Sequence, residues 1–250
     1  MKEQINSAVE WIKNQDVEGC ITGSCLLEYF EGQDIDVFCY SLKSFTELYY
    51  AMYHNPMFCM IDKLELWKAE QFRTRESFDG NKHKGGVTTL KFMYNTCVPV
   101  NIILKRNCDN IFSVISSFDL DIICKGFDLK TKQYLDLTNS PGKIASWNKW
   151  NPKYSNTEVW SISRILRQLD RCFKYHKRGY NTDSVVIKYI SLIDQLLEFE
   201  SIFNSENYNE RLEITKENTK IVKQICEVWL ETHEITDQEL ALLQTKLKEL

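Results

Sequence analysis

Two aspartates separated by one apolar residue, Asp34 and Asp36, have the types and spacing best suited to chemistry in this chain. Side chains alternate between the two faces of a strand, so a strand over this segment would place both carboxylates on one face. Carboxylates, together with phosphate oxygens and water, are the ligands that Mg²⁺ and Mn²⁺ prefer. The spacing therefore predicts a site for Mg²⁺ or Mn²⁺ that binds a nucleoside triphosphate.

Gly23 and Ser24 supply a second part of the same pattern, because they follow the apolar segment 20–22 and precede the aspartates. A glycine lets the chain turn closely past a ligand, and a helix start offers N–H groups and a hydroxyl to phosphate. We expect Gly23 and Ser24 to bind phosphate, although Ser24 would also serve as a plain helix N-cap. Without this glycine and serine, the aspartate pair would more often be a solvated strand face.

Hydrophobic periodicity predicts the elements that must position these residues. Strands are expected over 18–22, 34–40, 58–68, 98–104, 118–124 and 134–137, and helices over 4–14, 24–30, 44–53 and 110–117. The turn-rich segment 79–86 is expected to be a hairpin loop, either a solvated turn or a basic flap over a polyanionic substrate.

From about residue 157 onward, apolar residues recur at helical spacing. Further helices are expected over 184–203, 217–231 and 237–250, and the last of them begins with a capping box at Thr236 and Glu239. Its leucine stripe is expected to pack in a core. The chain is therefore predicted to be an α/β (α+β) protein with a mixed β-sheet and flanking helices in residues 1–145 and a helical domain in residues 155–250.

The segment Gly23-Ser24, a spacer and Asp34-Ile35-Asp36-Val37 resembles the signature of the DNA polymerase β-like nucleotidyltransferase superfamily. Phe118-Asp119-Leu120 and the later segment Arg171-x-x-Lys174-Tyr175-x-x-Arg178 look further like nucleotidyltransferase-like proteins of large DNA viruses and phages. The resemblance covers residues 5–180, approximately, and implies a nucleotidyltransferase-like sheet with a C-terminal helical module closing over the cleft.

The resemblance also implies roles for individual carboxylates. Asp34 and Asp36 would hold the metal ions, and a third carboxylate on a neighbouring strand would help to bind the catalytic metal and prepare the attacking hydroxyl. On one candidate strand stands Asn101, whose neutral amide is a poorer metal ligand and has no basicity. The other candidate offers Asp119, which we favour for the metal, or Asp121.

A cationic stripe marks the helix expected after residue 157. Helical spacing aligns Arg164, Arg167, Arg171, Lys174 and Arg178 on one side of it. Such a stripe is either a clamp for a triphosphate or nucleic-acid backbone, or a solvated helix face. The resemblance implies phosphate-binding roles for Arg171, Lys174 and Arg178, and Tyr175 either stacks on a nucleobase or packs in the core.

These residues predict a Mg²⁺-dependent nucleotidyltransferase that moves a nucleoside monophosphate from a triphosphate to a hydroxyl acceptor and releases pyrophosphate. The acceptor would be a nucleotide, RNA or protein. The alternative is a catalytically inactive protein of the same fold that binds nucleotides or a partner, motivated by Asn101 and by the acidic net charge of −4. That charge argues against long nucleic-acid substrates, because backbone binding relies on several cationic contacts.

Composition limits the remaining classes. With 250 residues, 43% hydrophobic and 12% aromatic, the chain has the composition of a globular protein rather than a disordered one. Nine cysteines without a C-x-x-C pair, together with four histidines at no ligand spacing from them, predict neither a zinc site nor a disulfide framework. We therefore expect a cytoplasmic protein, and no apolar run approaches membrane-spanning length.

Overall fold

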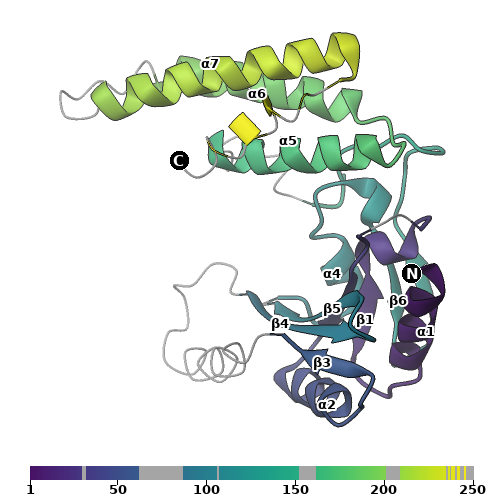
Figure 1. The fold of residues 1–250 in the computed structure, drawn as a ribbon. Coiled ribbons are helices and arrows are strands. Elements are labelled where there is room, and N and C mark those ends of the chain that lie inside the picture. The colour runs from purple at the N-terminus through teal and green to yellow at the C-terminus, as the bar shows by residue number, and fades with distance from the viewer. Residues whose placement is uncertain are drawn as a thin grey trace. The chain divides into compact units, whose positions relative to one another are not determined.

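The computed structural model describes residues 1–29, 32–61, 87–105, 107–151, 162–200, 209–234, 236, 238–239, 241–242 and 245. The chain divides into two compact units, Met1–Asn139 and Ser140–Leu250 (Figure 1). The hairpin loop predicted over 79–86 and the leucine stripe of the last predicted helix lie outside the described residues.

One mixed sheet of seven strands organises the unit Met1–Asn139, in the order β3-β4-β5-β2-β1-β6-β7. The strands are β1 (Gly19–Thr22), β2 (Ile35–Cys39), β3 (Phe58–Met60), β4 (Val87–Tyr94), β5 (Val98–Lys105), β6 (Lys125–Asp128) and β7 (Tyr134–Asp136). The helices are α1 (Lys2–Lys13), α2 (Leu42–Tyr53) and α4 (Ile111–Ile115), with short 3-10 helices η1 (Gly23–Leu26) and η2 (Asp121–Ile123). The predicted α/β class with a mixed sheet and flanking helices is confirmed.

Apolar layers on both faces of the sheet hold this unit together. On one face, side chains of α1 and α2 pack against the inward residues of the central strands. On the other face, α4 covers a smaller cluster that includes Phe38 and Ile103. Because strand residues alternate between faces, the face of Phe38 and Ile103 also carries Asp36 and Asn101. The polar residues thus share a face that is only partly covered by apolar packing.

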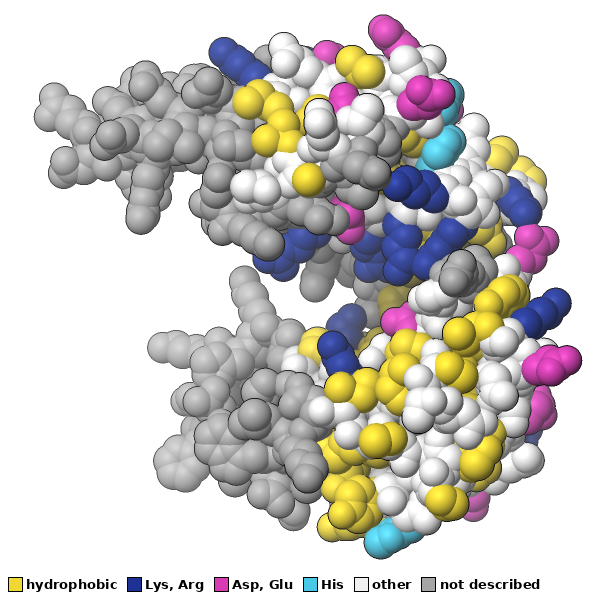
Figure 2. Space-filling view, viewed as in Figure 1, with side chains coloured by type: hydrophobic (Ala, Val, Ile, Leu, Met, Phe, Trp, Pro, Cys, Tyr) yellow, Lys and Arg dark blue, Asp and Glu magenta, His cyan; other side chains and the backbone are white. Residues whose placement is uncertain are grey.

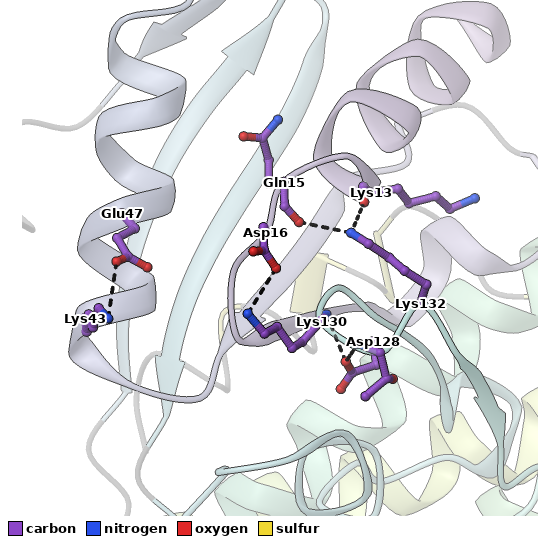
Figure 3. Close-up of polar contacts among 9 residues, drawn as sticks. Lys13, Gln15, Asp16, Lys43, Glu47, Asp128, Lys130 and Lys132 are labelled. Carbon is purple, nitrogen blue, oxygen red and sulfur yellow. Dashed lines mark hydrogen bonds and ion pairs between the residues drawn. The ribbon is translucent and has the colours of Figure 1, made fainter.

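The turn between β6 and β7 is tied to the end of α1 (Figure 3). The Lys132 ammonium donates to the backbone carbonyls of Lys13 at 2.6 Å and of Gln15 at 3.1 Å. Lys130 forms an exposed ion pair with Asp16 at 3.1 Å, a kind of contact that contributes little by itself. These contacts fix the turn after β6 next to the segment that leads from α1 into β1.

The strand predicted over residues 118–124 is wrong. Asp121–Ile123 form η2 instead, in which the Cys124 N–H donates to the Asp121 carbonyl at 2.9 Å, and the strand β6 begins only at Lys125. The physical reason is that the segment Leu120–Cys124, apolar except for Asp121, is buried, and burial of such a short segment does not depend on its being extended. The helix predicted over 24–30 is also shorter, since η1 ends at Leu26.

Three long helices account for most of the described part of the unit Ser140–Leu250. They are α5 (Ile162–Lys177), α6 (Asp183–Glu200) and α7 (Asn209–Thr232), as the helical periodicity of the second half predicts. Trp229 is buried in their core and its ring lies 5.1 Å from that of Phe173. The predicted capping box is confirmed: the Glu239 N–H donates to the Thr236 hydroxyl at 3.2 Å, and the Thr236 N–H donates to the Glu239 carboxylate at 2.8 Å. No helix of the described residues is long and apolar enough to span a membrane.

Candidate functional site

Asp34 and Asp36 lie together at the start of β2, where a third polar side chain joins them. The parallel register of β2 and β5 places Asp36 beside Asn101. The Asn101 amide nitrogen donates to the Asp34 carboxylate at 3.2 Å and to the Asp36 carboxylate at 2.8 Å. All three side chains are half-buried. The structure therefore brings the two predicted aspartates together and bridges them with an amide.

The bridging amide has a defined orientation, because ionised carboxylates only accept hydrogen bonds and the Asn101 nitrogen is the donor. Two like charges held side by side repel, and hydrogen bonds to the charged forms reduce that cost. Asn101 lies on one of the two strands that the sequence offers as candidates for a third carboxylate. It keeps the aspartate pair in place without adding charge or basicity.

Gly23 approaches the same aspartates from β1. Its φ of +80° lies in the left-handed region, and a Cβ at this position would stand 3.3 Å from a carboxylate oxygen of Asp36. The preceding residue, Thr22, is the register partner of Asp36 across β1 and β2. Only glycine combines this turn with so close an approach, as the sequence pattern predicts.

Ser24 is buried at the start of η1. Its backbone carbonyl accepts hydrogen bonds from the Leu27 N–H at 3.0 Å and from the side-chain amide of the buried Gln33. The second of these bonds ties η1 to the residue that precedes Asp34. Gln33 is a supporting residue that the motif did not identify, because a glutamine before an acidic pair carries no recognised signal.

A thiol also adjoins the aspartates. Cys25 donates from its sulfur to the Thr22 carbonyl at 3.2 Å. Burial, followed by the negative charges of Asp36 and Asp34, raises the pKa of Cys25 well above its ordinary value. The thiol therefore stays protonated near neutral pH, so the charged ligands offered here are hard carboxylate oxygens.

Asp119 lies just before η2, and Asp121 is its first residue. Both are buried, and Asp119 accepts a hydrogen bond from the Leu120 N–H at 3.0 Å. Burial, followed by the charges of Asp121 and Asp119, raises the pKa of Cys124, so these carboxylates lie around that thiol. Among the residues that the structure describes, no group of three or more His, Cys, Asp or Glu side chains is arranged to hold a metal ion. Neither aspartate joins Asp34 and Asp36 in such a group.

The donor set at Asp34 and Asp36 fits one Mg²⁺ ion better than two. The two hydrogen bonds from Asn101 occupy one oxygen of Asp34, at 3.2 Å, and one oxygen of Asp36, at 2.8 Å. Mg²⁺ is commonly bound in proteins through one or two carboxylates, with water and substrate phosphate as the other ligands. The residues present therefore suit a single divalent cation that is completed by a phosphate ligand.

Four residues of the predicted cationic stripe lie on α5 in the helical unit, and the fifth, Arg178, directly follows the last residue of that helix. Figure 2 shows Lys and Arg side chains gathered over this helix. Arg167 and Lys174 are exposed and Arg171 is half-buried, while the side chain of Arg164 is outside the described part. The Arg178 guanidinium lies over the Tyr175 ring, 5.3 Å from its centre.

Tyr175 itself is buried at 4% exposure and packs edge-to-face against Tyr180, with ring centres 6.0 Å apart. The sequence allowed two roles for Tyr175, stacking on a nucleobase or packing in the core, and this packing corresponds to the second. The structure thus brings Gly23, Asp34 and Asp36 together within the unit Met1–Asn139. The cations of the stripe belong to the other unit, Ser140–Leu250.

Comparison with known proteins adds one structural likeness. No model of a known protein family matches this chain, and no curated protein matches it. Among solved structures, the chain is similar to the CCA-adding enzyme of Thermotoga maritima complexed with tRNA_CCA, at 14% sequence identity and a TM-score of 0.40. The match covers 98% of this chain and 60% of that one, so this chain spans less than two thirds of its neighbour's length.

Proposed function

We propose that this protein is a Mg²⁺- or Mn²⁺-dependent nucleotidyltransferase. It would transfer a nucleoside monophosphate from a nucleoside triphosphate to a hydroxyl of a nucleotide, RNA or protein and release pyrophosphate. The observation that carries the proposal is the convergence of Asp34 and Asp36 beside the left-handed turn at Gly23. This arrangement combines hard anionic oxygens with a backbone that leaves room for a phosphate.

Each residue of this site has a distinct role in the proposal. Asp34 and Asp36 would hold the divalent cation, which when bound neutralises charge on the triphosphate and favours in-line displacement at the α-phosphate. Gly23 and Ser24 would line the path of the phosphates. Asn101 would orient both carboxylates through its two hydrogen bonds.

The α5 cations are a second part of the proposal. Arg171 and Lys174 lie at helical spacing on α5, Arg178 directly follows the helix, and guanidinium groups bind phosphate in a bidentate manner. We assign them to the phosphates of the nucleotide or of the acceptor. Arg178 would act from its place over the Tyr175 ring, which limits the freedom of its side chain.

A second candidate function is nucleotide binding without transfer. Asn101 supports it, because the amide lies between the two aspartates and cannot accept the proton of an attacking hydroxyl. So does the lack of a three-carboxylate group among the described residues. This protein would bind a triphosphate with a divalent cation and release it unchanged.

The compartment belongs to the same proposal. All nine cysteines are free, and six of them are buried. Free thiols throughout are typical of a reducing compartment. We therefore propose that the protein acts in the cytoplasm.

Incubation with each α-³²P-labelled nucleoside triphosphate and Mg²⁺ or Mn²⁺ tests the function, with and without RNA and cell extract. Transfer predicts labelled product that disappears in the Asp34→Asn and Asp36→Asn variants, which change charge but not size. Asp16→Asn is the matched control, because Asp16 is 80% exposed and its ion pair within the described part of the chain is the surface contact with Lys130. Cation-dependent binding without product favours the second candidate, and neither binding nor product contradicts both.

A further inference from the structure

Lys91 lies in line with the aspartate site, although nothing in the sequence motif points to it. The antiparallel register of β4 and β5 pairs Lys91 with Asn101. Asn101 is in turn the parallel partner of Asp36, and Asp36 is the antiparallel partner of Thr22. One row of residues thus runs across the four neighbouring strands β4, β5, β2 and β1. Lys91 is at one end of the row, and Asp36 is two strands away.

The alternation of β4 directs Lys91 to the same face as the site. Leu90 and Phe92 on either side are fully buried in the layer beneath α1 and α2. Lys91 is exposed, so its side chain projects from the opposite face, the one that carries Asp36 and Asn101. Within the described part of the chain, the Lys91 ammonium makes no ion pair.

The separation suits a shared ligand rather than a direct ion pair. Neighbouring strands lie about 4.8 Å apart, so two strand spacings put the backbone of Lys91 about 10 Å from that of Asp36. The flexible four-carbon stem of lysine covers a large part of such a distance. A triphosphate bound through a cation at the aspartates would extend into the same space.

We propose that Lys91 binds a phosphate of the nucleoside triphosphate held at Asp34 and Asp36. This inference rests on the proposed function and adds a specific anion-binding residue to it. The physical basis is charge complementarity. Because Asn101 is neutral, the site offers two carboxylates to one divalent cation. The Lys91 ammonium would then offer the polyphosphate a second positively charged group. The other reading of Lys91 is a solvated strand charge that protects the sheet against aggregation.

Equilibrium binding of Mn²⁺, alone and with each α,β-methylene nucleoside triphosphate, separates these readings. The variants are Lys91→Gln, Lys91→Arg and Asp34→Asn in the full chain. The matched control is Lys43→Gln, because Lys43 is an 83% exposed lysine on α2 with a single weak ion pair to Glu47 at 3.8 Å. Thermal unfolding of each variant verifies that it is folded.

We expect Lys91→Gln to weaken binding of the Mn²⁺ analogue complex about tenfold or more, as loss of a charge-assisted hydrogen bond does. Affinity for Mn²⁺ alone should not change, Lys91→Arg should retain most of the binding, and Lys43→Gln should match the wild type. Unchanged analogue binding in Lys91→Gln, with binding lost in Asp34→Asn, overturns the inference and leaves the proposed site standing. If wild type does not bind the analogues, or Asp34→Asn binds them equally well, both fail.

Discussion

Asn101 shows how much the chemistry of a site depends on one atom. Its amide donates to Asp34 and Asp36 at 3.2 and 2.8 Å, where an aspartate would add a third negative charge. The amide therefore stabilises the pair in the absence of cations, and a carboxylate would do so only with cations bound. This difference gives the substitution Asn101→Asp a clear signature.

We expect Asn101→Asp to lower the free energy of unfolding without divalent cations by about 1–3 kcal/mol, because it replaces two hydrogen bonds with repulsion. Mn²⁺ should bind the variant more tightly and restore its stability, since a third carboxylate adds a ligand. Thermal unfolding across a Mn²⁺ titration measures both effects. Asn107→Asp, the same change at an exposed position after β5, should show neither, and equal behaviour of the two variants would contradict the assignment.

Gly23 provides a second prediction at the scale of one residue. An alanine would be strained at φ +80° and would place its Cβ 3.3 Å from an Asp36 oxygen. Gly23→Ala should therefore lower the free energy of unfolding by about 1–2 kcal/mol and weaken Mn²⁺ binding. Urea unfolding and Mn²⁺ titration test the two effects. Gly32→Ala is the control, because it has a similar φ of +73° but meets nothing within 4 Å.

At the scale of the element, α4 depends on a close approach to β6. A Cβ on Gly126 would stand 2.9 Å from the side chain of Ile111 and 3.3 Å from that of Ile115. Gly126 is also the register partner of Thr22, so α4 packs over the same row of residues that contains Asp36. The helix therefore limits the candidate site on its β6 side.

We expect Gly126→Ala to displace α4 and to lower the free energy of unfolding by about 1–3 kcal/mol, as overpacking does. The further change Ile111→Val in the same chain should recover part of this loss, because the Ile111 side-chain terminus is the nearest clash. Urea unfolding of the single and double variants provides the measurement. Purely additive losses in the double variant would exclude the clash as the cause.

The turn after β6 predicts a dependence on pH. Burial alone would raise the pKa of Asp128, but hydrogen bonds from the Thr131 N–H, the Tyr40 hydroxyl and the Lys130 N–H hold it below its ordinary value. A carboxyl with a depressed folded-state pKa stabilises the protein above its unfolded pKa, about 3.9. That stabilisation is lost as the pH falls through the folded-state value.

Asp128→Asn should therefore lower the free energy of unfolding by about 1–2 kcal/mol at pH 7, and the gap to wild type should narrow below about pH 4. Urea unfolding at several pH values between neutral and strongly acidic conditions measures the gap. A gap that is independent of pH would mean that the charge of Asp128 contributes nothing. The exposed Asp16→Asn variant should show little difference at any pH.

At the scale of the whole molecule, each of the two compact units has its own core. The apolar layers of Met1–Asn139 surround the sheet, whereas Trp229 is the largest fully buried side chain among the described residues of the helical unit. Trp229→Ala should destabilise the helical unit by about 3–5 kcal/mol and leave Mn²⁺ affinity at Asp34 and Asp36 unchanged. Calorimetry combined with Mn²⁺ titration tests this, and a parallel loss of cation binding would show that the units fold as one.

The sequence alone determined those features that depend on neighbours along the chain. Alternation predicted the strand that carries Asp36, glycine chemistry predicted the turn at Gly23, and helical periodicity predicted α5, α6 and most of α7. Each depends on a few consecutive residues, whose local conformational preferences are strong.

Only the tertiary structure decided which distant residues meet the aspartates. Asn101 contacts them, and Lys91 lies two strands from Asp36, through the register of β2, β5 and β4, which is fixed by burial of the opposite sheet face and not by local sequence. Asp119 precedes the buried 3-10 helix η2 and lies near the Cys124 thiol, a place that the strand expected over 118–124 did not predict. Local sequence therefore fixed the aspartate pair, and long-range strand pairing fixed its chemical surroundings.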